Sequence, residues 1–306
     1  MKNNIEIRKS VIYTSNILNT IYTLNNSDIK EIEPSIRYVG KDVTNNGSTI
    51  EIGLIDKTGI YHFLSVEEIY MYDILLSWDT LTNTDEETSI FITFKDIDWI
   101  KNRQRRNKDY VKENHKLYAD VLKSLEKVLF KYGMKVSSLL DIKYIDEKDY
   151  EKGFVYNLGH LKTLLKQQNQ LVELNLNVFK YSSKEFMKYS IMRYMISSIY
   201  MNQVKRRTFS RTHKSILSSI TYIEDGNVYK YYDWLIKNKN FTTYIKRYYK
   251  RLEEVMKLLK ESGFIKDYKI IPDNNLRSLI TSCGKVDICT NVYKIKNKRQ
   301  YKYVKK

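Results

Sequence analysis

Basic side chains gather in four places along the chain, and their chemistry is electrostatic, because clustered Lys and Arg side chains neutralise phosphates and release the counterions condensed around a nucleic acid. The first cluster precedes and opens a long predicted helix and consists of Lys101, Arg103, Arg105, Arg106, Lys108, Lys112 and Lys116. The second opens a shorter predicted helix and consists of Lys205, Arg206, Arg207, Arg211, His213 and Lys214.

The third cluster lies on a second long helix, after hydroxyl side chains that can contact phosphates or bases. It consists of Lys246, Arg247, Lys250 and Arg251, preceded by Thr242, Thr243 and Tyr244. The fourth is the C-terminal tail, with interleaved tyrosines, and consists of Lys294, Lys296, Lys298, Arg299, Lys302, Lys305 and Lys306. A solvated helix face for the first cluster and a solubilising tail for the fourth are the plain alternatives.

The overall charge agrees with a polyanionic partner. The 306 residues include 53 Lys and Arg against 36 Asp and Glu, a formal net charge of +17. A genome of low GC content also enriches Lys, Asn, Ile and Tyr, so the total charge alone does not separate the two explanations. The clustering favours nucleic acid, and we expect double-stranded DNA as the partner.

Common catalytic patterns are missing. The sequence has no Gly-x-x-x-x-Gly-Lys-Ser/Thr loop, no His-x-His pair and no Gly-x-Ser-x-Gly turn. Cys283 and Cys289 are too few for a zinc site, so neither a metal nor a cofactor is expected. We therefore expect a protein that is not an enzyme.

One enzymatic alternative stays open, a DNA-cleaving relaxase or an enzyme like the tyrosine recombinases. Such enzymes use a tyrosine nucleophile while Arg and His stabilise the phosphate, and Arg211-Thr212-His213 precedes many tyrosines. The usual His-x-x-Arg box is absent, because Lys214, Ser215 and Ile216 follow His213.

Neither a leader nor a membrane span is predicted. Residues 1–10 have no apolar core of a signal peptide, and no run of 18 apolar residues occurs. We expect a cytoplasmic protein without membrane association.

The first half of the sequence predicts strands followed by helices. Residues 36–40, 49–55 and 60–64 read as strands. Ser65 and Glu68 form a capping-box pattern that opens a helix. A second helix begins around residues 92–97, and a long helix is expected from Lys108 to Lys131, ended by Gly133. Strand-like segments follow at residues 134–136, 142–145 and 154–156.

The second half repeats this order. Helices are expected at residues 184–204 and 241–262, the latter ended by Gly263, with another helix start at residues 207–210. Strands are expected at residues 264–271, 286–289 and 292–295. The two long helices align at a constant offset, with the pairs Tyr118/Tyr248, Leu122/Leu252, Leu125/Val255, Val128/Leu258, Leu129/Leu259 and Gly133/Gly263. This alignment predicts an internal duplication, with two unrelated helical domains as the alternative.

A long helix followed by a β-hairpin is typical of a winged helix. We therefore predict an α+β fold, predominantly α, with two winged-helix domains in tandem, each a helix-turn-helix plus a hairpin wing. The predicted parts are an N-terminal β-containing extension (residues 1–64), a first winged-helix domain (65–160) and a second one with a basic tail (161–306).

The chain resembles plasmid replication initiators (Rep) of the tandem winged-helix kind from low-GC bacteria. The resemblance is one of layout over residues 60–300 and rests on Phe63 to Ile97, Tyr118 to Gly133, Met187 to Tyr194 and Arg247 to Ile265. It implies binding to repeated origin sites through both winged helices, recruitment of host replication proteins and a homodimeric form. Other winged-helix regulators and partition factors share the layout and stay open as alternatives.

Overall fold

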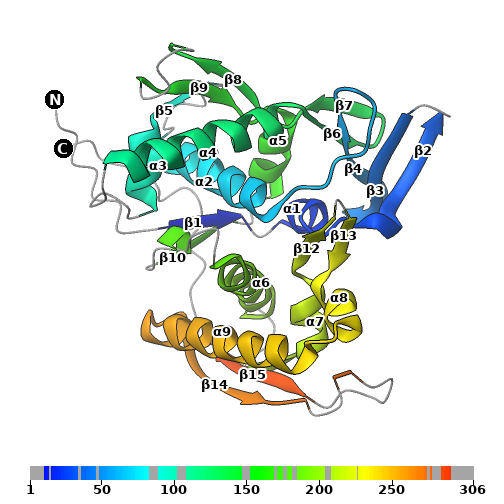
Figure 1. The fold of residues 1–306 in the computed structure, drawn as a ribbon, viewed down its shortest axis with the longest axis vertical. Coiled ribbons are helices and arrows are strands. Elements are labelled where there is room, and N and C mark those ends of the chain that lie inside the picture. Colours follow the sequence, from blue (N-terminus) through cyan, green and yellow to red (C-terminus); the bar gives the residue numbers. More distant parts are fainter. Residues whose placement is uncertain are drawn as a thin grey trace. The chain divides into compact units, whose positions relative to one another are not determined.

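The computed structural model of the chain describes a defined set of residues. These are residues 10–13, 15–33, 36–45, 48–82, 89–101, 108–146, 152–168, 171–174, 178–180, 185–203, 208–225, 227–273, 276–277 and 284–290. They form two compact units, the described residues up to Glu173 being unit 1 and those from Leu174 onward unit 2 (Figure 1).

Unit 1 contains a winged-helix arrangement. In chain order it includes α2 (Val66–Thr82), β5 (Ile90–Ile92), α3 (Phe94–Ile100), α4 (Lys108–Glu126), β8 (Asp141–Tyr144) and β9 (Phe154–Asn157), and two further strands lie between α4 and β8. The three strands form an antiparallel sheet in the order β5-β9-β8. Three helices, with a strand after the first and a hairpin after the third, confirm the layout predicted for the first winged helix.

The predicted capping box at the start of α2 is present. The Ser65 hydroxyl accepts a hydrogen bond from the Glu68 amide at 3.2 Å, and the Ser65 amide donates to the Glu68 carboxylate at 2.6 Å. Tyr72, Leu75 and Leu76 on this helix are buried, as the periodicity predicts. After β9 the chain continues through α5 (Gly159–Gln168) to β10 (Leu171–Leu174), which pairs with β1 (Ser10–Tyr13).

The predicted end of the first long helix is wrong. Helix α4 ends at Glu126, and the following residues form β6 (Val128–Tyr132), which pairs with β4 (Ser48–Asp56). Gly133 has φ +60° in the turn between β6 and β7 (Lys135–Ser138), so it does not cap a helix. Strand pairing supplies backbone partners to a segment whose apolar residues also fit a helical period.

The N-terminal strands are part of unit 1 and do not form a separate extension. Strands β2 (Ile29–Glu33), β3 (Ile36–Asn45) and β4 join β6 and β7 in one antiparallel sheet ordered β2-β3-β4-β6-β7. The third strand predicted here, at residues 60–64, does not form. Within this range only Tyr61 makes a β-bridge, an isolated one to Ile55. Before this sheet come α1 (Asn16–Ile21) and a short 3-10 turn, η1 (Asn26–Asp28).

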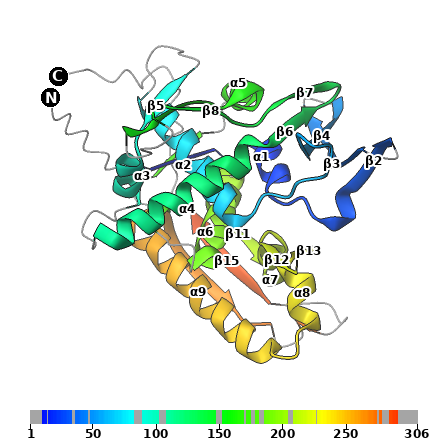
Figure 2. The same cartoon turned by 45° about the horizontal axis from the view of Figure 1, so that its top comes forward.

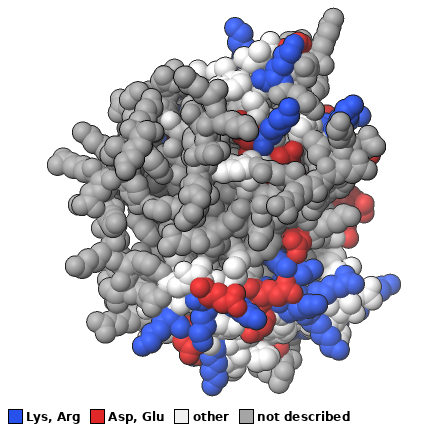
Figure 3. All heavy atoms as spheres, turned by 90° about the vertical axis from the view of Figure 1, so that its left-hand side faces the viewer, with Lys and Arg blue, Asp and Glu red and all other residues white. Residues whose placement is uncertain are grey.

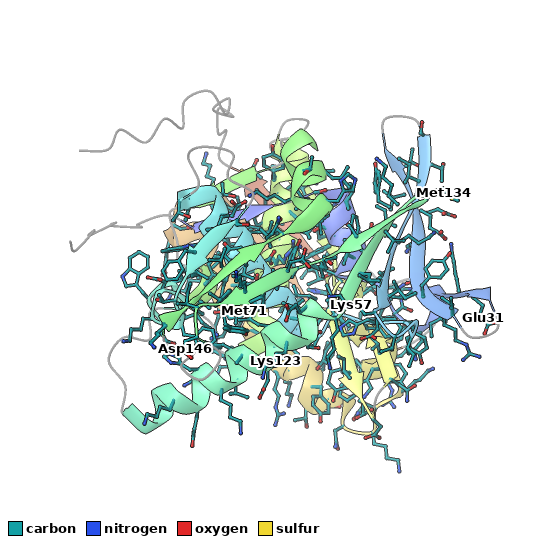
Figure 4. The ribbon with its side chains drawn as sticks, turned by 90° about the horizontal axis from the view of Figure 1, so that it is seen from above. Glu31, Lys57, Met71, Lys123, Met134 and Asp146 are labelled. Atoms are coloured by element: carbon teal, nitrogen blue, oxygen red, sulfur yellow. The ribbon has the colours of Figure 1, made fainter. Side chains whose placement is uncertain are left out.

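The ends of this sheet are visible from above. Glu31 lies on the edge strand β2, and Met134 lies at the turn between β6 and β7 (Figure 4). Met134 is 98% exposed, whereas Met71 of α2 is buried in the core of the unit.

Unit 2 contains a second winged-helix arrangement. After η3 (Val178–Lys180) it comprises α6 (Phe186–Gln203), β11 (Thr208–Thr212), α7 (His213–Ser218), α9 (Phe241–Glu261), β14 (Ile265–Ile271) and β15 (Lys285–Thr290). Its three-stranded sheet has the order β11-β15-β14. If the strands are numbered along the chain, this sheet and the sheet β5-β9-β8 of unit 1 both have the order first, third, second. Figure 2 shows the long helices α4 and α9, one in each unit. The chain is thus an α+β protein with more helix than strand.

An insertion separates α7 from α9 in unit 2. It consists of the hairpin β12 (Thr221–Glu224) and β13 (Asn227–Lys230), followed by α8 (Tyr231–Lys237). The sequence did not predict these elements. Helix α9 itself begins at Phe241 as predicted and ends one residue early, with Gly263 at φ +74° beyond its C-cap Ser262. The strand predicted at residues 292–295 lies outside the described residues.

The two units repeat one local device at the start of the second helix. Thr93 caps α3 and is followed by Phe94, while Thr212 caps α7 and is followed by His213. Thr93 therefore corresponds to Thr212. The predicted helix start at residues 207–210 is wrong, since residues 208–212 form β11. No helix within the described residues combines the length and the apolar character that crossing a membrane requires.

Replacement of Leu252 by Ala tests the packing of α9. The side chain is fully buried on the stripe that packs against α6 and β14. Leu252→Ala is expected to lower the free energy of unfolding by about 2–5 kcal/mol through lost burial and a residual cavity. Lys250→Ala, on the exposed face of the same helix, is the matched control and should change it by less than about 0.5 kcal/mol. Urea denaturation measures both, and equal stabilities would contradict the packing of α9.

Candidate nucleic-acid interface

Helix α9 has one buried face and one basic face. The buried face consists of Ile245, Tyr248, Leu252, Val255, Met256 and Leu259. On the opposite side, Thr243, Lys246, Arg247 and Lys250 are all exposed within the first three turns. The spacing of three and four residues places these four side chains on one outward surface. This exposed group, here called the basic face of α9, is the part of the third predicted cluster that the structure brings together.

The charges on α9 change character along the helix. Beyond the basic face, Arg251 pairs with Glu254 at 3.1 Å, Lys257 with Glu261 at 3.8 Å and Lys260 with Asp267 at 2.7 Å. Lys188 of α6 also pairs with Glu254, at 2.6 Å. On the face that Figure 3 shows, blue and red side chains intermingle over unit 2 in the same way.

These ion pairs change the pKa of Glu254. The hydrogen bond from Lys188 is the main cause that lowers the pKa of Glu254, and Arg251 adds to it. By contrast, within the described part of the chain no carboxylate pairs with Lys246, Arg247 or Lys250. The start of α9 therefore keeps a positive charge that no described carboxylate neutralises.

A buried histidine holds α9 against α7. His213 is fully buried, and its Nε2 lies 2.8 Å from the carbonyl oxygen of Ile271. Because a carbonyl can only accept, Nε2 carries the proton and Nδ1 accepts from the Tyr248 hydroxyl at 3.0 Å. The prediction that counted His213 with the surface charges of the second cluster is therefore wrong.

Aromatic rings fix the first turn of α9. The Trp234 ring of α8 lies 4.2 Å from the Tyr222 ring and 5.0 Å from the Tyr244 ring, measured between centroids. The indole N–H of Trp234 donates to Glu224 at 2.7 Å. The inserted hairpin and α8 thus support the helix start from which the basic face projects. These residues carry no charge-cluster signal, so sequence reasoning missed them.

Lys101 of the first predicted cluster is not a surface residue. Its side chain is 6% exposed, and its ammonium lies 4.3 Å from the ring centroid of Tyr118 and 4.7 Å from that of Tyr70. Contact with two aromatic faces offsets part of the free-energy cost of burying the ammonium group. Lys101 is also the C-cap of α3, where the helix dipole stabilises a cation. Its assignment to a DNA contact is therefore wrong.

The rest of the first cluster is only partly described. Lys112 and Lys116 are exposed on α4. Lys108 is the first residue of α4. Three further members of the cluster lie outside the described residues, namely Arg103, Arg105 and Arg106.

The second cluster divides in the same manner. Arg211 lies on β11 rather than on a helix, and its Nε donates to the Ser198 hydroxyl at 3.2 Å. Lys214 is exposed on α7. The remaining members, Lys205, Arg206 and Arg207, lie outside the described residues, as do Lys298 and Arg299 of the tail.

Unit 1 uses a different polar cluster to hold its long helix. The Asp98 carboxylate of α3 lies 2.7 Å from His115 Nε2 and accepts from the Tyr118 hydroxyl at 2.9 Å. All three side chains are buried. Over the ranges that the structure describes, no three His, Cys, Asp or Glu side chains come together as a metal site would require.

Comparison with known proteins gives a likeness of structure alone. No family model matches the chain, and no curated protein matches it. The crystal structure of the Pi initiator protein in complex with iteron DNA aligns with a TM-score of 0.50 at 12% identity, over 93% of this chain and 98% of that one. Crystal structures of RctB domains 2 and 3 align with TM-scores of 0.46 and 0.45 at 11% and 12% identity, over 90% and 89% of this chain and 99% and 97% of those chains.

The likeness to the Pi initiator protein shows the fold. Because the alignment covers nearly the whole of both chains, it includes both units and the sheet that precedes and interrupts the first winged helix. At 12% identity it does not by itself carry over a function.

The burial of His213 predicts a pH dependence of stability. Burial disfavours the imidazolium and lowers the pKa of His213 below its usual 6.5. Its contribution to the free energy of unfolding is thus fully present above about pH 6.5 and is lost as the pH falls through the folded-state pKa. Thermal melts of the parent and of His213→Gln between about pH 8 and pH 5.5 measure it.

The variant separates this group from all others. His213→Gln should be less stable than the parent at high pH, because the bonds to Tyr248 and Ile271 are impaired. The difference between the two proteins should shrink as the pH falls, since only the parent loses the contribution of a neutral His213. A difference that stays constant over this pH range would refute the assignment.

Proposed function

We propose that the protein binds duplex DNA sequence-specifically at repeated sites of a plasmid origin and thereby initiates replication. The observation that carries this proposal is the basic face of α9, on the third helix of a winged-helix unit, whose cations pair with no described carboxylate. The Pi initiator protein, which shares the fold, is described in complex with iteron DNA, and this supports the proposal.

The position of the basic face fits the reading element of a helix-turn-helix. In that motif the N-terminal turns of the recognition helix reach base edges in the major groove. Arg247 has the planar fork that can bind guanine in two places, and Thr243 can contact a base or a phosphate. Lys246 and Lys250 suit phosphate contacts on either side of the groove. On α4 of unit 1, Lys112 and Lys116 occupy the corresponding outer surface.

Two alternatives remain within winged-helix proteins, a transcriptional regulator and a partition factor. The near-complete coverage of the Pi initiator protein favours the initiator. A replicon test separates the three: the gene with its flanking repeats should sustain a plasmid that lacks any other origin. Recruitment of host replication proteins and a homodimeric form are parts of the proposal that rest on the resemblance to initiators alone. A cytoplasmic location is a further part and rests on the sequence patterns described above.

The placement of His213 argues against the relaxase or recombinase alternative. Its chemistry needs Arg211 and His213 at a DNA-facing site, whereas His213 is fully buried and bonded to Tyr248 and Ile271. Arg211 is bonded to Ser198. This placement supports a protein that binds DNA without cutting it.

Lys250→Ala tests the basic face directly. Parent protein should bind a fluorescent duplex with log affinity falling linearly in log salt, at about −0.9 per phosphate contacted. If Lys250 contacts phosphate, Lys250→Ala lowers the steepness of this line by about one for all sequences; if it contacts a base, discrimination at one position falls by about 1–3 kcal/mol. Fluorescence anisotropy on a selected site and on random DNA measures both.

The matched control lies on the same face of the same helix. Lys257 is exposed two turns beyond Lys250 but is paired with Glu261. Lys257→Ala should bind DNA like the parent. Parental binding by both Lys250→Ala and Arg247→Ala would show that α9 is not the reading helix.

Incubation of supercoiled plasmid with the protein and a divalent cation tests the absence of catalysis. The plasmid is expected to stay supercoiled, because His213, one of the two candidate residues, is buried and bonded to Tyr248 and Ile271. Agarose gels before and after protease treatment detect nicking and covalent attachment. A nicked product with protein attached through a tyrosine would restore the relaxase hypothesis.

A further inference from the structure

We propose that Arg277, in the turn before β15, binds a phosphate of the DNA backbone beside the first turn of α9, and that an aromatic ring holds it ready to do so. The inference rests on the proposed function and adds a contact outside the reading helix. No charge cluster in the sequence contains Arg277.

The Arg277 side chain is fixed at two points. The carbon of its guanidinium lies 5.4 Å from the centroid of the Phe241 ring, at the first residue of α9. Its Nε donates to the carbonyl oxygen of Ile236 at 3.1 Å. Among the described residues these are its only partners, so the terminal amino groups of the guanidinium remain available as donors.

Two other cations near the start of α9 are held in the same way. The Lys214 ammonium lies 5.3 Å from the Tyr232 ring, whose hydroxyl donates to the carbonyl oxygen of Leu276 at 3.3 Å. That bond ties the ring under Lys214 to the turn that carries Arg277. The Arg247 guanidinium lies 5.6 Å from the Tyr244 ring, one helical turn after Phe241.

The type of partner distinguishes these cations from structural ones. Carboxylates neutralise Lys188, Arg251 and Lys260. No carboxylate of the described chain pairs with Lys214, Arg247 or Arg277. Glu224, on the inserted hairpin, accepts the indole N–H of Trp234.

An aromatic ring orders a cation without neutralising it. The side chain then loses less conformational entropy when a phosphate arrives, and its full charge is still available to displace a counterion. A guanidinium held against a ring also presents its fork to a phosphate in a restricted range of directions. The arrangement therefore fits duplex DNA backbone phosphate, contacted without regard to sequence.

The test uses the full-length protein and a short fluorescein-labelled duplex of mixed sequence. Arg277→Ala should weaken binding about 5-fold near 0.15 M salt and reduce the steepness of the log–log salt dependence by about one, as expected for one phosphate. Arg277→Lys should keep the steepness, because the charge remains, and lose part of the affinity, because a lysine lacks the planar fork.

Lys260→Ala is the matched control. Lys260 also lies over a ring, 6.0 Å from the centroid of Tyr268, but it is paired with Asp267. This variant should bind with the affinity and the salt dependence of the parent. Phe241→Leu removes the ring and should weaken binding by itself, and Arg277→Ala should then cost less in that background than in the parent, because the two residues act together.

The outcomes separate the inference from the proposed function. If the parent binds the duplex with a steep salt dependence and both Arg277 variants match it, the contact is absent while DNA binding stands. If the parent shows no salt-dependent binding, the proposed function fails and the contact with it. Should Arg277→Ala melt at a much lower temperature, Arg277→Lys and Phe241→Leu decide the question.

Discussion

In each unit the orientation of the long helix is set by one tyrosine, which meets the edge of a ring at the first position of α3 in unit 1 and of α7 in unit 2. Tyr118 meets Phe94 with ring centroids 6.0 Å apart and planes at 83°, and Tyr248 meets His213 at 5.7 Å and 87°. A threonine N-cap stands immediately before both rings and fixes where their helices begin. This contact fixes the rotation of the long helix, and a slip by one residue would turn its outward side by about 100°. The exposure of the basic face of α9 depends on it.

The two units meet this constraint with different chemistry. In unit 1 the ring is apolar, and polarity comes from Asp98, which bonds both His115 and Tyr118. In unit 2 the ring itself is polar and bonds Tyr248 and the Ile271 carbonyl. The shared geometry with different side chains accords with a duplication followed by divergence, which stays a prediction.

Sequence periodicity predicted the elements that carry their own signals. Helix α9 combines an apolar stripe with a glycine beyond its C-cap, so its bounds could be predicted within a residue. The end of α4 could not, because Val128–Tyr132 suits a helix or a strand, and β4, distant in sequence, decides between them. The same pairing explains why β2, β3 and β4 resembled a separate extension. Their partners β6 and β7 are inserted inside the winged helix.

Charge clusters predicted the candidate site less well than periodicity predicted the fold. Clustering in sequence does not report which side chains are buried, so Lys101 and His213 were counted as surface charges although rings and hydrogen bonds enclose them. Arg277 was missed for the opposite reason. It stands alone in a turn, and folding brings it to Phe241.

The formal charge of +17 also overstates the charge that faces a partner. Glu51 binds both Lys30 and Lys131 on the sheet of unit 1 and accepts from Tyr38 at 2.8 Å. Burial disfavours its charge, but hydrogen bonds from Lys131, Lys30 and Tyr38 outweigh burial and lower the pKa of Glu51 to about 2.

The Glu51 group serves the sheet. Its tyrosine, Tyr38, lies across Gly40 and Gly53, where an added Cβ would come within 2.7 Å and 3.1 Å of the Tyr38 ring. The two lysines of this group therefore form ion pairs that link strands of the sheet. Lys162 is likewise paired, with the buried Asp79 at 2.8 Å. A lysine that is already paired releases little or no counterion when DNA binds. The cations relevant to affinity are therefore those without a carboxylate partner. Within the described residues of unit 2 these include Lys246, Arg247 and Lys250 at the start of α9, and Lys266 and Lys269 on β14.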